Sequence, residues 1–334
     1  MRKIRIGDRI VGDGEPTFII TEAGINHNGK IELAKKLIRE AANAGANAVK
    51  FQMFKVEEFC SKNSEYFDLF KALEFSEEGW IEIAEFAKDI GIIFTASVSG
   101  KESADLLDKV ESPVYKIASG DLTHLPLLNY VARKNRPIIL STGMSTIGEI
   151  EEAISEIYKT GNQQVVLLHC VSNYPSKYEE TNLRAIQTLK DVFDVPVGFS
   201  DHTVGTIIST VAVAMGANII EKHFTLNKNM EGPDHRLSLE PYEFKEMVKN
   251  IGSIERTLGD GVKKPTKDED NVKKLVRRSI TARVKIPEET IITKDNIKIV
   301  RPGNGIEPKF VDLVIGRIAK KNIAKDEPIK WDAV

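Results

Sequence analysis

The chain has 334 residues, of which 41% are hydrophobic, so it can bury a large core and suits one large domain with a smaller one. A formal net charge of −2 without long runs of one sign gives no reason to expect a nucleic-acid partner. We expect no signal peptide and no membrane span, because no segment approaches ~18 consecutive apolar residues. Two cysteines, Cys60 and Cys170, make no disulfide framework, so we expect a cytoplasmic protein.

Short apolar runs alternate with helical patterns from the start of the chain. The runs are continuous, as in parallel strands that are covered on both faces, and lie at 18–23, 48–52, 92–96, 114–118, 137–141, 165–169, 197–200 and 219–223. The helical stretches between them include 31–44, 77–90, 101–110, 147–160 and 204–215. Such strand–helix units over about 250 residues predict a (β/α)8 TIM barrel. An open doubly wound sheet is the alternative, although no glycine-rich fingerprint follows the first strand.

Two stretches interrupt this pattern. Residues 54–75 are too long for a simple connection and are predicted to form an active-site loop. After Leu258 the chain becomes polar and then forms short extended runs. We therefore predict a barrel domain at 1–262, a linker at 263–278 and a small domain at 279–334. So small a domain has a thin core and is expected to dock on another surface.

Two histidines end neighbouring predicted strands. His202 and His223 lie on either side of a strand–helix–strand unit, whose strands normally run parallel. They therefore meet at one edge of the sheet, where neutral imidazoles suit a divalent ion such as Zn, Mn, Fe or Co. Two structural histidines at strand ends would give the same pattern.

The other predicted strands also carry polar side chains at their carboxyl ends, where barrels of this kind place their chemistry. Lysines and hydroxyls suit a phosphate or carboxylate, and a metal polarises a carbonyl or activates water. The rim therefore predicts metal-assisted chemistry on a phosphorylated, acidic small molecule. Lys50 and Lys116 stand out because a lysine within a barrel strand must reach a polar partner. His27, His124 and Cys170 are expected to be structural.

Eight motifs in order resemble the sialic acid synthase family, whose members make nonulosonic acids. They are EAGINHNG (22–29), KFQ (50–52), KIASG (116–120), STGM (141–144), YP (174–175), SDHT (200–203), EKHF (221–224) and GPDH (232–235). The tail is similar to that family's C-terminal SAF domain, which resembles type III antifreeze proteins, at 301–303 and 316–317. The resemblance covers almost the whole chain.

The resemblance implies a C–C bond-forming transferase that condenses phosphoenolpyruvate with a 2-acetamido hexose and releases phosphate. The sugar would be N-acetylmannosamine or a 2,4-diacetamido-trideoxy analogue, and phosphate would leave by C–O cleavage through a tetrahedral intermediate. His202 and His223 would hold Mn²⁺, with Mg²⁺ or Co²⁺ as alternatives, to polarise the aldehyde and position water. Glu22 would be an acid/base or hold sugar hydroxyls.

The same resemblance assigns the substrate contacts. Phosphoenolpyruvate would be bound by Lys50, Thr95, Lys116, Ser119, Ser141, Asn173 and Ser200. The sugar would be bound by Gln52, Tyr174, Asp234 and, from the partner subunit, Arg301. The expected assembly is therefore a homodimer with swapped C-terminal domains.

The resemblance leaves two contacts and the choice of sugar open. Residues 94–99 (FTASVS) depart from the Ser-Thr-Pro-Phe type run of relatives, so Thr95 and Ser97 compete for the phosphate contact. Asn173 carries over less well than Tyr174. Residues 116–121 and 178–183 look closer to the legionaminate and N-acetylneuraminate branches than to pseudaminate. The alternatives are a Schiff-base pyruvate aldolase using Lys116 or Lys50, and a carbohydrate- or ice-binding protein led by the tail.

Overall fold

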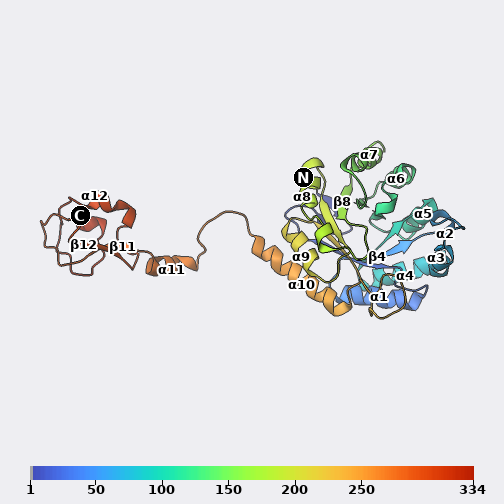
Figure 1. Ribbon diagram of the computed structural model, residues 1–334, viewed down its shortest axis with the longest axis horizontal. Coiled ribbons are helices and arrows are strands. Elements are labelled where there is room, and N and C mark those ends of the chain that lie inside the picture. The colour runs from blue at the N-terminus through green and yellow to red at the C-terminus, as the bar shows by residue number, and fades with distance from the viewer. Residues whose placement is uncertain (1–2) are drawn as a thin grey trace. The chain divides into compact units, whose positions relative to one another are not determined.

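The computed structural model describes residues 3–334, which form two compact units divided between Gly259 and Asp260 (Figure 1). In the first unit eight parallel strands close into a barrel in the order β10-β3-β4-β5-β6-β7-β8-β9. The strands are β3 (Phe18–Gly24), β4 (Ala48–Met53), β5 (Ile93–Val98), β6 (Tyr115–Ile117), β7 (Ile138–Ser141), β8 (Val165–Cys170), β9 (Val197–Asp201) and β10 (Ile219–His223). The predicted (β/α)8 barrel is confirmed.

Helices surround the barrel and bury one face each against its strands (Figure 1). They are α1 (Ile31–Asn43), α4 (Glu77–Ile90), α5 (Lys101–Lys109), α6 (Leu125–Ala132), α7 (Ile147–Tyr158), α8 (Ala185–Val192), α9 (Ile207–Ala214) and α10 (Pro241–Leu258). Helix α9 begins at Ile207, three residues later than the pattern predicts. The delay arises because Asp201 accepts a hydrogen bond from the Thr203 N–H (2.8 Å) and Gly205 has a φ of 82°, so the chain turns before the helix starts.

Apolar side chains fill the amino-terminal half of the barrel interior. A hairpin that the sequence pattern did not predict, β1 (Ile4–Ile6) with β2 (Arg9–Val11), packs against the first residues of several barrel strands. This cluster comprises Ile4, Ile6, Val11, Phe18, Ile20, Ala48, Val114, Ile139, Val166, Leu168 and Ile219. The interior polar side chains are therefore collected at the carboxyl ends of the strands.

The connection after β4 is folded rather than irregular. It contains α2 (Val56–Phe59) and α3 (Phe67–Leu73), which meet through aromatic rings. The Phe54 ring lies 5.1 Å from that of Phe59 and 5.5 Å from that of Phe70, measured between centroids. These contacts supply the small core that a connection of this length needs.

The second compact unit, Asp260–Val334, has its own apolar core, built around residues such as Ile280, Ile292 and Ile329. It contains α11 (Glu269–Val276), α12 (Val311–Val314) and the antiparallel pair β11 (Ser279–Ala282) with β12 (Ile297–Val300). Helix α11 lies inside the predicted linker 263–278, so that segment is not a plain linker. The helix has an acidic first turn and a basic last turn, which complement its dipole. Its polar composition made it resemble a linker in the sequence. None of the helices over residues 3–334 is long and apolar enough to cross a membrane.

Candidate active site

A cavity of about 310 Å³ opens among the carboxyl ends of the barrel strands. Each of the eight strands, or the residue directly after it, contributes at least one lining side chain. The cavity brings together most of the predicted site residues: Glu22, Lys50, Gln52, Lys116, Ser119, Ser141, Tyr174, Ser200, His202 and His223. These residues are spread over 202 positions of the chain, from Glu22 to His223, and closure of the barrel brings them together.

The alternation of side chains along each strand explains why these residues point inward. Lys50 lies two positions after Ala48, and Glu221 lies two positions after Ile219, both of which belong to the interior apolar cluster. The parallel register pairs Glu22 with Lys50 on the neighbouring strand. A polar layer is thereby stacked directly on the apolar layer of the barrel.

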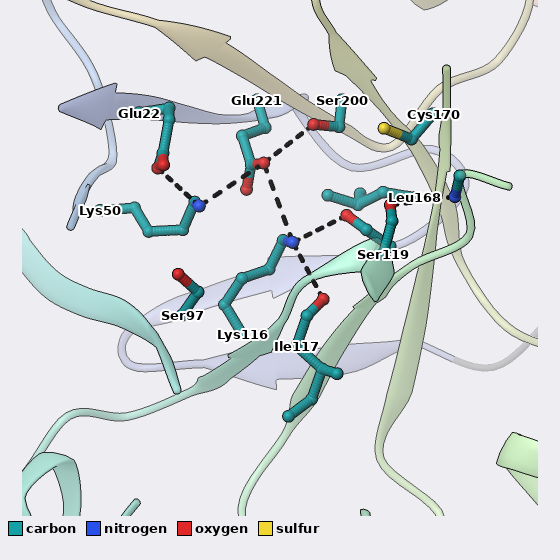
Figure 2. A network of polar contacts seen from close by, with 12 residues as sticks. Glu22, Lys50, Ser97, Lys116, Ile117, Ser119, Leu168, Cys170, Ser200 and Glu221 are labelled. Atoms are coloured by element: carbon teal, nitrogen blue, oxygen red, sulfur yellow. Dashed lines mark hydrogen bonds and ion pairs between the residues drawn. The ribbon is translucent and has the colours of Figure 1, made fainter. Parts of the chain in front are cut away.

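Charged side chains form one connected network in the floor of the cavity (Figure 2). Lys50 Nζ lies 2.5 Å from Glu22 Oε2 and 3.7 Å from Glu221 Oε1. Lys116 Nζ lies 3.9 Å from the same Glu221 oxygen and donates to Ser141 Oγ at 2.7 Å. Ser200 Oγ donates to Glu221 Oε1 at 2.9 Å. The four charged side chains are at most 5% exposed, so these contacts are shielded from water.

The two carboxylates of this network have opposite pKa shifts. Burial raises the pKa of Glu22 above its ordinary value, despite the opposing charge of Lys50. Burial also acts on Glu221, but the charges of Lys116 and Lys50 outweigh it and lower the Glu221 pKa. Burial lowers the pKa of Lys116. Two carboxyl groups whose pKa values are pushed apart can divide acid and base roles.

The histidine pair lies beside this network. The short contact of 2.7 Å between His202 Nδ1 and the Val171 carbonyl oxygen indicates that Nδ1 carries the proton and donates it, which leaves the Nε2 lone pair available. His223 Nδ1 is buried without a hydrogen-bond partner among residues 3–334, and Asp234 Oδ2 lies 3.9 Å away. The ring centroids are 5.4 Å apart. Burial lowers the pKa of His223 well below its ordinary value, so this imidazole is neutral.

These features fit a divalent ion held by two imidazoles. A neutral, unpaired buried nitrogen on His223 and an oriented imidazole on His202 are suitable donors for Mn, Zn or Co. Among residues 3–334, no group of three or more His, Cys, Asp or Glu side chains is arranged to hold a metal. Two imidazoles alone would leave the other coordination positions of such an ion to water or substrate.

Two residues predicted to contact phosphoenolpyruvate, Thr95 and Asn173, do not line the cavity. Thr95 is fully buried two residues before Ser97 on β5, and its hydroxyl donates to the Val114 carbonyl at 2.9 Å. Ser97 lines the cavity instead. Asn173 is exposed, and its side-chain amide donates to Glu180 Oε2 at 3.1 Å. Thr95 and Asn173 therefore have partners of their own.

The remaining predicted sugar contacts are placed differently from one another. Gln52 and Tyr174 line the cavity, and the Tyr174 ring lies 4.1 Å from that of His202 between centroids. Asp234 lies near His223 at the edge, and burial raises its pKa. Arg301 belongs to the second compact unit.

The sequence places Glu221 at the end of a predicted strand but assigns it no role, although it links both lysines. A usable signal was present, because Glu221 lies two residues before His223 and therefore on the same strand face. Cys170, expected to be a buried structural residue, also lines the cavity, and its Sγ lies 3.7 Å from His202 Nδ1. His27 has the expected structural role. It is buried, accepts from the Gly29 N–H and packs against the Phe75 ring.

A closed parallel barrel with buried lysines, carboxyl groups and a histidine pair at its carboxyl end defines the protein as a barrel enzyme. Comparison with family models then identifies it more closely: the NeuB family model matches residues 37–263, and the SAF domain model matches residues 277–334. The chain belongs to the NeuB family, which includes sialic acid synthases, and carries a C-terminal SAF domain.

Individual relatives agree with this family. The chain is 44% identical to N,N'-diacetyllegionaminic acid synthase of Campylobacter jejuni over 94% of this chain and 99% of that protein. It is 40% identical to the Legionella pneumophila enzyme of the same name, over 100% of this chain and 98% of that protein. A crystal structure of N-acetylneuraminic acid synthetase from Leptospira borgpetersenii, 38% identical, superposes with a TM-score of 0.78 over 81% of this chain and 95% of that one.

Proposed function

We propose that this protein condenses phosphoenolpyruvate with a 2-acetamido sugar and releases phosphate, as a nonulosonic acid synthase. The observation that supports this reaction most strongly is the buried network of Lys50, Lys116, Glu22 and Glu221 beside the histidine pair. The two relatives named for N,N'-diacetyllegionaminic acid favour a 2,4-diacetamido-2,4,6-trideoxy hexose as the sugar over N-acetylmannosamine.

The network supplies the charges that this reaction needs. Phosphoenolpyruvate is a small polyanion, and Lys116, Lys50 and the hydroxyls of Ser119, Ser141 and Ser200 are suited to its phosphate and carboxylate. Both lysines are at most 5% exposed, and a buried cation attracts an anion strongly in a site that excludes water.

The proposed step is balanced in protons by Glu22. C3 of phosphoenolpyruvate attacks the sugar aldehyde carbon, and the aldehyde oxygen takes the Glu22 proton to become a hydroxyl. Water adds at C2 and returns a proton to Glu22, which gives a tetrahedral intermediate. Its C2–O bond to phosphate then breaks, and the C2 hydroxyl gives its proton to the departing phosphate as the ketone forms. A divalent ion, Mn²⁺ before Mg²⁺ or Co²⁺, would be held by His202 and His223 and supplies Lewis acidity toward the aldehyde oxygen and water. Gln52, Tyr174 and Asp234 would orient the sugar.

The assay that tests this function follows phosphate release from phosphoenolpyruvate, with Mn²⁺ or with EDTA. The sugars are N-acetylmannosamine, its 6-phosphate and 2,4-diacetamido-2,4,6-trideoxy hexoses. We expect release that depends on both the metal and one sugar, with the diacetamido sugar giving the highest kcat/KM. Absence of release with any of these sugars would reject the synthase assignment.

A second candidate, a Schiff-base pyruvate aldolase, is favoured by one observation: burial lowers the pKa of Lys116, as an amine nucleophile requires. The hydrogen bond from Lys116 to Ser141 and the nearby histidine pair instead suit anion and metal binding. Borohydride reduction in the presence of pyruvate separates the two candidates, because only the aldolase would gain the mass of a reduced pyruvyl adduct on Lys116.

The SAF domain gives a further prediction. We propose that the protein is a homodimer in which Arg301 of each chain enters the partner's barrel and binds the sugar. Arg301→Ala should raise the KM for the sugar about 10- to 100-fold, as the loss of a charged hydrogen bond does, and change the KM for phosphoenolpyruvate less.

Mixed dimers test whether Arg301 acts on the partner subunit. Arg301→Ala and His223→Ala chains are each expected to be nearly inactive at low sugar concentration. After the two are unfolded and refolded together in equal amounts, about half the dimers are mixed, and each mixed dimer holds one intact site if domains are swapped. Activity should therefore return to about a quarter of wild type. If activity stays at the level of the separate variants, Arg301 does not act across the dimer.

A further inference from the structure

We infer that Lys222 and Asp201 are positioning residues that set the spacing of the histidine pair. Their buried ion pair joins the backbone directly before His223 to the turn that surrounds His202. The inference rests on the proposed role of the pair as metal ligands. It concerns residues that line no part of the cavity and would act only through the histidines.

Lys222 contacts both chain neighbours of His202. Its Nζ lies 3.0 Å from Asp201 Oδ2 and donates to the Thr203 carbonyl oxygen at 2.5 Å. The Lys222 side chain is 1% exposed and that of Asp201 is 0% exposed. One ammonium group therefore holds the residues on both sides of His202, from a strand position adjacent to His223.

Asp201 is equally committed to this contact. Its Oδ1 accepts hydrogen bonds from the Thr203 N–H at 2.8 Å and from Thr203 Oγ1 at 2.7 Å. Its Oδ2 accepts from Ser209 Oγ on α9 at 2.6 Å, in addition to the contact with Lys222. Both carboxylate oxygens are fully used, so the turn that carries His202 is fixed to β10 and to α9 together.

The ion pair lies where the hydrogen-bonded pairing of β9 with β10 ends. The registered pairing of β9 with β10 ends at Asp201 and Lys222, so no ladder pair joins His202 directly to His223. Side chains alternate along a strand, which places Lys222 and Asp201 on the outer face and the two histidines toward the cavity. The hydrogen bond from Lys222 Nζ to the Thr203 carbonyl therefore extends the connection between the strands past the last ladder pair, to the residue that follows His202.

Stability alone is a weak reason for this arrangement. Removing two charges from water is costly, and buried ion pairs can often be replaced by apolar residues of similar volume without loss of stability. Partners behind metal ligands, in contrast, typically change metal affinity by ~10- to 100-fold when they are altered. A positioning role thus predicts a loss of metal affinity that is not matched by a loss of stability.

The test is the double variant Asp201→Asn/Lys222→Met in the full chain. Methionine matches the lysine side chain as far as Cε and lacks the ammonium group. Asparagine keeps an oxygen that can accept from Thr203, so no unpaired charge is buried. The dissociation constant for Mn²⁺ alone is measured from the electron paramagnetic resonance signal of the free ion. We expect it to rise ~10- to 100-fold. The Tm without metal and the dissociation constant for phosphoenolpyruvate should stay within a few degrees and about twofold of wild type.

The chain offers a matched control at the other end of the barrel. Lys190 Nζ lies 2.6 Å from Asp13 Oδ1, and that oxygen also accepts from the side-chain amide of Asn218, which precedes β10. Asp13→Asn/Lys190→Met makes the same chemical change near the opposite end of β10. It should leave Mn²⁺ affinity at the wild-type value.

Three results would overturn the inference. These are wild-type Mn²⁺ affinity in the folded Asp201→Asn/Lys222→Met variant, an equal loss of Mn²⁺ and phosphoenolpyruvate affinity with a lowered Tm, and wild-type protein that does not bind Mn²⁺. The proposed function is judged separately, by phosphate release from the wild-type enzyme. A wild type that releases phosphate while the double variant binds Mn²⁺ normally would reject the positioning role and leave the synthase assignment in place.

Discussion

His223→Ala is expected to remove metal-dependent phosphate release almost completely, by about 10³-fold or more in kcat/KM, while the barrel remains folded. A bound ion contributes several kcal/mol to charge stabilisation in the transition state, and each 1.36 kcal/mol is a factor of ten in rate. The pair has only two protein nitrogens to offer, so losing one removes half of the protein's ligands to the proposed ion.

The fold should survive because the unliganded protein gains little from this imidazole. His223 Nδ1 is buried without a hydrogen-bond partner among the described residues, so alanine removes an unsatisfied polar atom together with some packing. We expect the Tm without metal to change by only a few degrees. Mn²⁺ at 100 times its dissociation constant should stabilise the wild type by about 2.7 kcal/mol and should not stabilise the variant.

His124→Ala is the matched control for this measurement. His124 is an exposed residue before α6 and makes no side-chain cap to the helix. It should retain both turnover and the rise of Tm with Mn²⁺. If His223→Ala kept wild-type metal stabilisation, the histidine pair would not be the metal site, whatever happened to its turnover.

The barrel strands were predictable because each is a continuous apolar run that ends in a polar residue. Strand β10 illustrates this: the predicted run 219–223 and the observed Ile219–His223 coincide. The same strand shows the limit of the approach. Alternation places Glu221 beside His223, yet only the closed barrel reveals that Glu221 contacts Lys50 and Lys116 from two other strands. The sequence predicts which face of the strand a side chain lies on, but not which residues it contacts across the barrel.

The errors have a common physical origin. Thr95 and Ser97 lie on the same face of β5, so alternation cannot decide between them. What separates the two residues is their distance from the carboxyl end of the barrel. Thr95 lies further inside, where its hydroxyl reaches the Val114 carbonyl. How far inside the barrel a residue lies depends on the stagger between neighbouring strands, and the sequence of a single strand does not reveal that stagger. The hairpin of β1 and β2 was missed for a similar reason. Its apolar residues gain packing partners only from several barrel strands that are distant in the sequence.

The expected result for Lys116→Met is a loss of about 10³-fold in kcat/KM for phosphoenolpyruvate, with a smaller effect on the KM for the sugar. Lys116 donates to Ser141 and lies 3.9 Å from Glu221, so its removal takes away a buried cation where an anion would bind. Removing one member of a buried charge pair costs about 2–5 kcal/mol. A loss of 10³-fold in rate corresponds to about 4 kcal/mol, which lies within this range. Initial-rate kinetics with each substrate varied in turn measure the effect.

A second substitution separates the two ways in which Lys116 can act. Lys116→Met leaves Glu221 with Lys50 as its remaining cation, so the variant should also lose about 1–3 kcal/mol of unfolding free energy. Lys116→Met/Glu221→Gln removes the unbalanced carboxylate and should recover that stability. It should not recover phosphoenolpyruvate use, because a methionine cannot donate to a phosphate. Full recovery of kcat/KM in the double variant would show that Lys116 only balances Glu221. Lys134→Met, which removes a lysine paired with Asp105 on the outside of the barrel, should leave both substrates unaffected.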